Sequence, residues 1–120
     1  MKAIIFTSPK EGPADRILES VVVGVDDTVG NLTLDTYIQD FIRNMRKGLT
    51  DFKLIESTPS TLSGFAAHQI IFSSSQLKEL HVPTIKNKVL YWIMYVVERE
   101  KYDKFLYAAE QMISSFELLD

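Results

Sequence analysis

The chain has 120 residues, of which 46% are hydrophobic and 24% are charged. This length and composition predict one globular domain, spanning residues 1–120, that buries roughly two-thirds of its unfolded surface. Its 13 basic residues are outnumbered by 16 acidic residues, whereas proteins that bind nucleic acid carry a basic excess to offset phosphate charge. We therefore expect no nucleic-acid partner.

Two absences from the sequence exclude thiol chemistry and a membrane-spanning segment. The sequence contains no cysteine, which excludes disulfides, thiolate catalysis and cysteine-ligated metal centres. The longest apolar run, Val89 to Val97, has nine residues, and a transmembrane helix needs about 20. The apolar stretch Ala3–Phe6 near the start is too short for the core of a secretory signal. We expect no transmembrane segment, and the composition assigns no compartment.

The first half of the chain predicts two strands and a helix. Short apolar runs indicate strands over Ala3–Phe6 and Val21–Val25. Apolar residues then recur at spacings of three and one, which predicts an amphipathic helix over Leu34–Lys47. Thr33 is its expected N-cap, and Gly48 its expected stop. The apolar stripe consists of Leu34, Tyr37, Ile38, Phe41, Ile42 and Met45.

The second half predicts four strands and a terminal helix. The strands are Phe52–Glu56, Ala66–Phe72, Leu77–Ile85 and Lys88–Glu98. Tight turns are expected within Ser73–Gln76 and at Lys86–Asn87, and Pro83 predicts a bulge or a locally unpaired position. A second apolar stripe predicts a helix over Tyr102–Phe116. Because short turns join antiparallel strands, the expected fold class is α+β, an antiparallel sheet flanked by helices.

The sequence contains none of the compact catalytic motifs. It has no phosphate-binding loop, no dinucleotide glycine fingerprint, no Gly-x-Ser-x-Gly elbow and no His-Glu-x-x-His pair. We therefore predict a non-enzymatic binding module without a cofactor. Two other interpretations rank behind this one. The second is a metal- or ligand-binding protein, described next, and the third is an enzyme whose site is assembled from scattered residues.

Two histidines carry the alternative interpretation, a small metal- or ligand-binding protein. If both hairpin loops have two residues, His81 lies opposite His68 on one side and Trp92 on the other, with Glu79 opposite Ile70. Directly opposed side chains have Cβ atoms about 5 Å apart, so His68, His81 and Glu79 would be candidate ligands of a divalent metal. The competing explanation is a structural histidine pair packed on Trp92. An odd-length loop would place the histidines on opposite faces.

Several segments resemble the PsbP-like family. Phe52–Ser57, Thr61–Gly64 and Ala66–Ala67 are similar to the middle of these proteins. Val89–Tyr102 and Met112–Glu117 are similar to their C-terminal strand and helix. The resemblance covers about residues 18 to 118. These motifs mark turns and packing, and none of them carries chemistry.

This resemblance implies a fold and a class of function. PsbP-like proteins have an antiparallel sheet between helices, a fold also found in a nuclear-import factor that binds the GTPase Ran. Members with known roles are binding or assembly factors, and many prokaryotic members are lipoproteins anchored outside the cytoplasm. The resemblance therefore implies a protein partner and an extracytoplasmic location. Because the sequence is most similar to short archaeal and bacterial members, it does not imply a role in photosynthesis.

One departure from the family concerns the N-terminus. Family members usually begin with a hairpin that carries a Tyr or Phe, a Pro and a Trp, and this chain starts after that hairpin, at the strand Ala3–Phe6. A sheet without the hairpin would expose a strand edge, which favours pairing with another strand. We accordingly predict a homodimer or a strand-exchanged assembly formed through a sheet edge.

Overall fold

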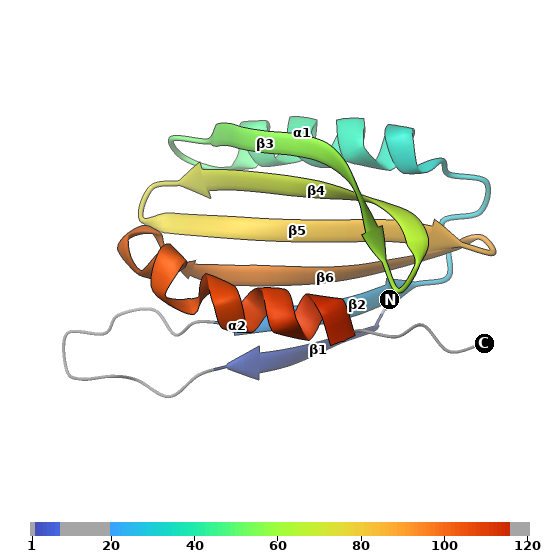
Figure 1. The fold of residues 1–120 in the computed structure, drawn as a ribbon. Coiled ribbons are helices and arrows are strands. Elements are labelled where there is room, and N and C mark those ends of the chain that lie inside the picture. The colour runs from blue at the N-terminus through green and yellow to red at the C-terminus, as the bar shows by residue number, and fades with distance from the viewer. Residues whose placement is uncertain (1, 8–19, 116–120) are drawn as a thin grey trace.

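One antiparallel sheet of six strands organises the fold, in the order β1-β2-β6-β5-β4-β3 (Figure 1). The computed structural model describes residues 2–7 and 20–115. The strands are β1 (Lys2–Thr7), β2 (Ser20–Asp26), β3 (Lys53–Leu62), β4 (Phe65–Ser74), β5 (Leu77–Lys86) and β6 (Val89–Glu98). The helices are α1 (Leu34–Gly48) and α2 (Tyr102–Ser115), and the short 3-10 helix η1 (Arg99–Lys101) precedes α2. The predicted α+β class is confirmed.

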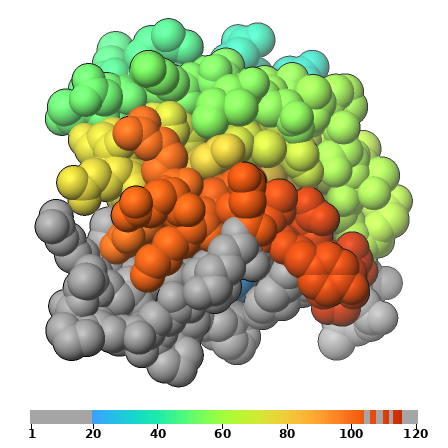
Figure 2. All heavy atoms as spheres, turned by 60° about the vertical axis from the view of Figure 1, so that its left-hand side comes forward, coloured from blue at the N-terminus to red at the C-terminus, as the bar shows by residue number. Residues whose placement is uncertain are grey.

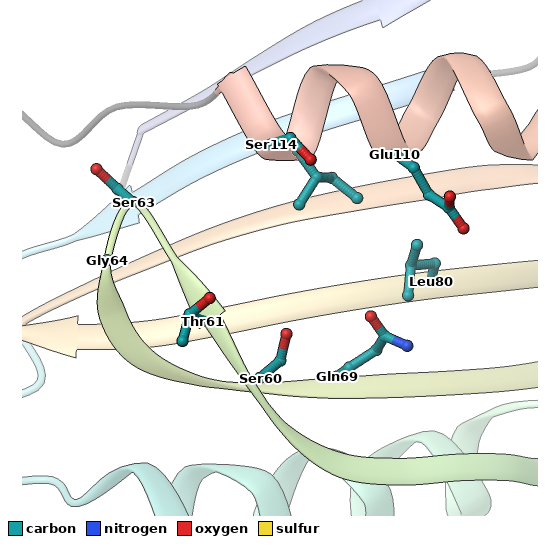
Figure 3. Close-up of a pocket in the computed structure, with 9 residues that line it drawn as sticks. Ser60, Thr61, Ser63, Gly64, Gln69, Leu80, Glu110 and Ser114 are labelled. Atoms are coloured by element: carbon teal, nitrogen blue, oxygen red, sulfur yellow. The ribbon is translucent and has the colours of Figure 1, made fainter.

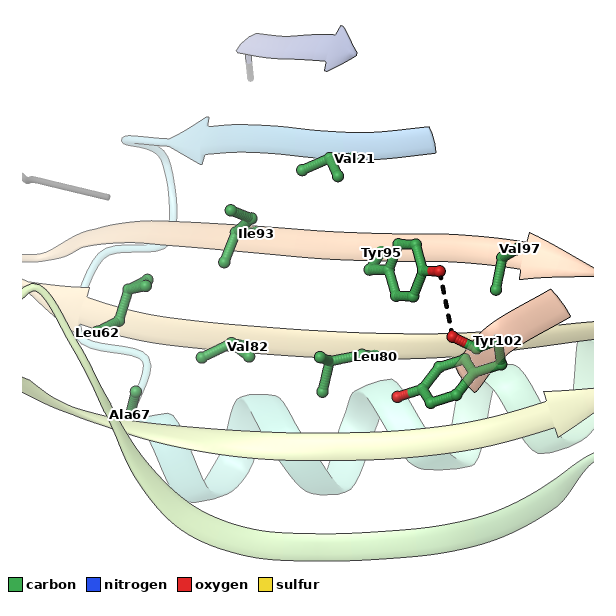
Figure 4. Packing of buried hydrophobic residues seen from close by; sticks show 9 residues of the cluster. All are labelled: Val21, Leu62, Ala67, Leu80, Val82, Ile93, Tyr95, Val97 and Tyr102. Atoms are coloured by element: carbon green, nitrogen blue, oxygen red, sulfur yellow. Dashed lines mark hydrogen bonds between the residues drawn. The ribbon is translucent and has the colours of Figure 1, made fainter. Parts of the chain in front are cut away.

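The two helices cover opposite faces of the sheet (Figure 1). On the first face, Ile38 of α1 packs with the fully buried Ile70 and Phe72 of β4. On the second face, Leu106 and Ile113 of α2 pack against a larger apolar cluster (Figure 4). The buried members of that cluster are Val21, Leu62, Ala67, Leu80, Val82, Ile93, Tyr95, Val97 and Tyr102. The central strands thus contribute side chains to two cores, which explains why they are apolar on both faces.

The helix boundaries follow the predicted signals with one correction. Thr33 is the N-cap of α1, and its hydroxyl accepts a hydrogen bond from the backbone N–H of Thr36. Gly48 does not stop the helix but forms its last residue, and the N–H of Leu49 closes the end on the carbonyl of Met45. The predicted end of α2 at Phe116 lies outside the described residues. Neither described helix is long and apolar enough to cross a membrane.

The two predicted hairpin turns lie one residue further along the chain than expected. Ser74 pairs with Leu77, and Lys86 pairs with Val89. In each hairpin, the residue opposite a given position therefore lies two residues further along the chain than predicted. Asn87 and Lys88 form the second turn with φ values of 52° and 65°, the backbone that a two-residue hairpin loop requires. Because the shift is even, every side chain stays on its predicted face.

Pro83 does not produce a bulge. It pairs in register with Trp92 of β6, and β4 and β5 keep one register on both sides of it, through Ala67 with Thr84 and Ile70 with His81. The pairing between β4 and β5 is interrupted between those two positions, because proline has no N–H to donate. The prediction of a locally unpaired position is confirmed, and that of a bulge is wrong.

Candidate functional site

His81 lies in the core between the sheet and α1, where it is only 1% exposed. Its Nε2 lies 2.9 Å from the hydroxyl of Tyr37, and its ring stacks on Phe41 with centroids 4.3 Å apart. Its Nδ1 is buried and has no hydrogen-bond partner. Burial lowers the pKa of His81 to about 3, because the surroundings stabilise the neutral imidazole over the cation. These contacts are those of a packed, uncharged core histidine.

His68 shares the sheet face of His81 but makes a different contact. It lies on β4 two residues from Ile70, and Ile70 is the residue directly opposite His81. The Nε2 of His68 lies 2.7 Å from the hydroxyl of Ser57 on β3. The predicted direct pair of His68 with His81 is therefore wrong, and its cause is the two-residue shift in register.

Glu79 is the third predicted ligand, and it too has a different neighbour. Its opposite residues are Phe72 on β4 and Val96 on β6, where Ile70 was expected on β4. The side chain is half-buried, and burial raises the pKa of Glu79 to about 7. Within residues 2–7 and 20–115, no three His, Asp or Glu side chains lie together as metal ligands would. Metal binding by His68, His81 and Glu79 stays a prediction, which titration can test.

Trp92 lies opposite Pro83 and Gly24, where the prediction placed it opposite His81. A Cβ atom added at Gly24 would overlap the indole of Trp92. Glycine at this position therefore lets the indole lie directly on the backbone of β2. Trp92 is a packing residue between β2 and β5, and the predicted packing of the histidines against it does not occur.

The strand β3 forms one edge of the sheet and is the most exposed strand whose side chains are described. Its outer backbone groups have no neighbouring strand in the described part of the chain. Leu54 is 39% exposed and Ile55 is 53% exposed, next to a β-bulge between Leu54 and Glu56. Pro59 also belongs to β3, and proline within a sheet is confined to edge strands and bulges. An unpaired edge with exposed apolar side chains beside it is a surface on which another strand can add.

A cleft of about 490 Å³ opens between α2 and the hairpin that joins β3 to β4 (Figure 3). Figure 2 shows the same side of the molecule, with α2 in orange to red beside the green strands β3 and β4. The lining residues are Ser60, Thr61, Ser63, Gly64, Gln69, Leu80, Glu110, Ile113 and Ser114. Sequence patterns did not predict this cleft, because its walls come from segments about 40 to 50 residues apart.

The twist of the β3–β4 hairpin creates the cleft. Ser63 and Gly64 form the hairpin loop with φ values of 53° and 80°, so glycine supplies a backbone conformation that other residues rarely adopt. On the opposite wall, Glu110, Ile113 and Ser114 share one face of α2, because residues three and four apart are neighbours on a helix. Six of the nine lining residues carry a hydroxyl, an amide or a carboxylate group, and none of the nine is basic.

The sequence matches no protein-family model and no curated protein. Solved structures do match it over almost its whole length. A Pseudomonas aeruginosa protein of unknown function, PA94, which is described as a candidate regulator, superposes with a TM-score of 0.85 at 20% identity. The match covers 99% of this chain and 84% of PA94.

Two further structures have the same arrangement of strands and helices. The cyanobacterial PsbP protein (CyanoP) of Synechocystis matches with a TM-score of 0.60 at 13% identity, over 98% of this chain and 82% of CyanoP. LpqN of Mycobacterium tuberculosis, a protein involved in cell envelope biogenesis, matches with a TM-score of 0.60 at 17% identity, over 95% of this chain and 68% of LpqN. At these identities the likeness establishes the architecture alone. The chain has a PsbP-like fold.

Proposed function

We propose that this protein is a non-enzymatic binding module of the PsbP-like family that pairs with a partner through the outer edge of β3. The observation that carries the proposal is the exposed edge itself, with Leu54 and Ile55 beside it. Strand addition satisfies the unpaired backbone groups, and adjacent apolar side chains contribute the surface that is removed from water. The names of the three similar structures describe a candidate regulator, a PsbP protein and an envelope-biogenesis protein, and none of these names states a reaction.

The partner we favour is a second copy of this chain. Two β3 strands that meet antiparallel across a two-fold axis present the same surface to each other, so one edge is sufficient for both sides of the interface. Pro59 cannot donate a backbone hydrogen bond, and the pairing would therefore use the first half of the strand, Lys53–Thr58. That half contains both exposed apolar side chains, Leu54 and Ile55.

The molar mass in solution tests this proposal. Light scattering during size exclusion should give twice the mass of one chain, and Ile55→Lys should shift the mass toward that of a single chain, because a buried charge at the new interface is costly. The matched control is Tyr107→Lys, since Tyr107 is also an exposed large hydrophobic residue, at 73%, but lies on α2. A single-chain mass for the wild type would refute the homodimer, as would equal effects of the two lysine substitutions.

We extend the proposal to an extracytoplasmic location. The family resemblance supports this location, as does the architecture shared with LpqN, a protein named for its role in cell envelope biogenesis. Fractionation of cells that express the natural gene with a C-terminal tag would test it. Recovery of the tagged protein in the cytoplasmic fraction alone would contradict it.

A further inference from the structure

We propose that the cleft between α2 and the β3–β4 hairpin binds a small cationic ligand that carries an ammonium or guanidinium group. The proposal concerns the α2 face of the sheet and does not depend on pairing through the β3 edge. Its basis is the set of hydrogen-bonding groups that face the cleft, which accept more bonds than they donate.

Gln69 shows this bias most directly. Its amide nitrogen donates to the carboxylate of Glu56 at 2.6 Å, which fixes the orientation of the amide. One of the two N–H groups of this nitrogen is therefore engaged outside the cleft, and the amide oxygen of Gln69 can accept a bond within it. Gln69 lines the cleft from β4 (Figure 3), so that wall offers an acceptor backed by a carboxylate.

The opposite wall offers a full negative charge. Glu110 projects from α2 on the side of Leu80 (Figure 3), and it forms no ion pair with any residue in the described part of the chain. Ser114, one helical turn later, adds a hydroxyl on the same wall. A carboxylate on one wall and an amide oxygen on the other suit a ligand that presents several N–H donors around one positive charge.

The apolar cluster that shares Leu80 with the cleft contains an unsatisfied hydroxyl. Tyr102 is 3% exposed, and its hydroxyl has no hydrogen-bond partner. Its ring extends toward Leu80, a lining residue of the cleft (Figure 4). Burial and, after it, the negative charges of Glu110, Asp103 and Glu56 together raise the pKa of Tyr102 to about 12. Glu110 of the cleft lining and Glu56, which holds the amide of Gln69, therefore both act on this one position.

The charges around the cleft favour a cation over an anion or a neutral sugar. An anion would meet the carboxylate of Glu110, and that of Glu56 behind Gln69, with no lining basic residue to offset them. Lys78, whose Nζ lies 4.1 Å from the centroid of the Tyr102 ring, does not line the cleft. A saccharide would find several acceptors in the cleft. It would find few donors of fixed direction, because most of the lining donors are hydroxyls, whose hydrogens rotate.

Agmatine is a suitable probe, because it carries a guanidinium at one end and an ammonium at the other. Titration of agmatine into the intact protein at low ionic strength, followed by amide NMR, should shift signals in two segments that are distant in sequence, 60–64 and 110–114. Glu110→Gln should weaken the binding by about fivefold, the upper range for a charge pair that involves an exposed carboxylate. Raising the salt concentration to physiological strength should also weaken it.

The matched control is Glu100→Gln, which removes the same charge from an exposed residue of η1 that does not line the cleft. This variant should bind agmatine as the wild type does. Equal binding by Glu110→Gln and the wild type would overturn the proposal, as would the absence of shifts in either segment. Shifts produced by glucose but not by agmatine would retain a ligand cleft but refute a cationic ligand.

Discussion

Substitution of Glu79 by Gln should make the stability of this protein strongly dependent on pH. Glu79 and His81 lie two residues apart on the same face of β5, toward α1. Burial raises the pKa of Glu79 from 4.5 to about 7 and lowers that of His81 from 6.5 to about 3. Both side chains therefore prefer their neutral forms in the folded protein, and their effects on stability have opposite dependence on pH.

The signs follow from proton binding. The folded-state pKa of His81 is lowered, so its contribution to the free energy of unfolding is present above about pH 6.5. This contribution is lost as the pH falls toward about 3, because the unfolded chain then binds a proton that the folded chain does not. The folded-state pKa of Glu79 is raised, so its contribution is present below pH 4.5 and is lost as the pH rises toward about 7. Between about pH 4.5 and 6.5 the two slopes oppose each other.

The magnitudes can be worked from these values, at about 1.4 kcal/mol for each pH unit of uncompensated proton uptake. Between about pH 7.5 and about pH 5.5, loss of the His81 contribution lowers the free energy of unfolding and gain of the Glu79 contribution raises it, each by between about 1 and 2 kcal/mol. The two nearly cancel in the wild type. Glu79→Gln removes the second contribution, so the variant should itself lose between about 1 and 2 kcal/mol over this interval, whereas the wild type should change little.

Urea denaturation at a series of pH values, followed by the fluorescence of Trp92, measures these free energies. The complementary variant is His81→Gln, which keeps a hydrogen-bonding group near Tyr37 but does not titrate. It should become more stable as the pH is lowered over the same interval. Parallel pH profiles for the wild type, Glu79→Gln and His81→Gln would refute the reasoning, because they would mean that burial shifts neither pKa.

Three further predictions concern packing, helix capping and metal binding. Gly24→Ala should destabilise the fold by about 1–3 kcal/mol, because the new methyl group overlaps the indole of Trp92, and a changed emission maximum of Trp92 would report the displacement. Thr33→Ala should cost about 1 kcal/mol by removing the N-cap bond of α1, as measured by thermal unfolding. Calorimetric titration with zinc or copper should give the same result for the wild type and His68→Ala, and specific binding that this substitution abolishes would support the metal-binding interpretation instead.

Local patterns in the sequence determined the helices and the two faces of the sheet. The spacing of Ile38 and Phe41 along α1 predicted the face that packs on the sheet, because an amphipathic stripe is a property of neighbouring residues. With two-residue loops, alternation along the strands predicted His68 and His81 on one face, and the structure has them on one face because its register differs by an even number of residues.

Only the tertiary structure decided which residues are partners. The registers depend on the position of each turn, and Asn87 and Lys88, with positive φ, form the turn one residue later than predicted. The turn between β4 and β5, at Ser75 and Gln76, is displaced in the same way, and that displacement separated His68 from His81. The cleft depends on still longer-range geometry, since Gln69 and Glu110 meet only when the hairpin twists and α2 packs across β5 and β6. Such contacts are fixed by packing between distant segments, for which residue spacing along the chain carries no signal.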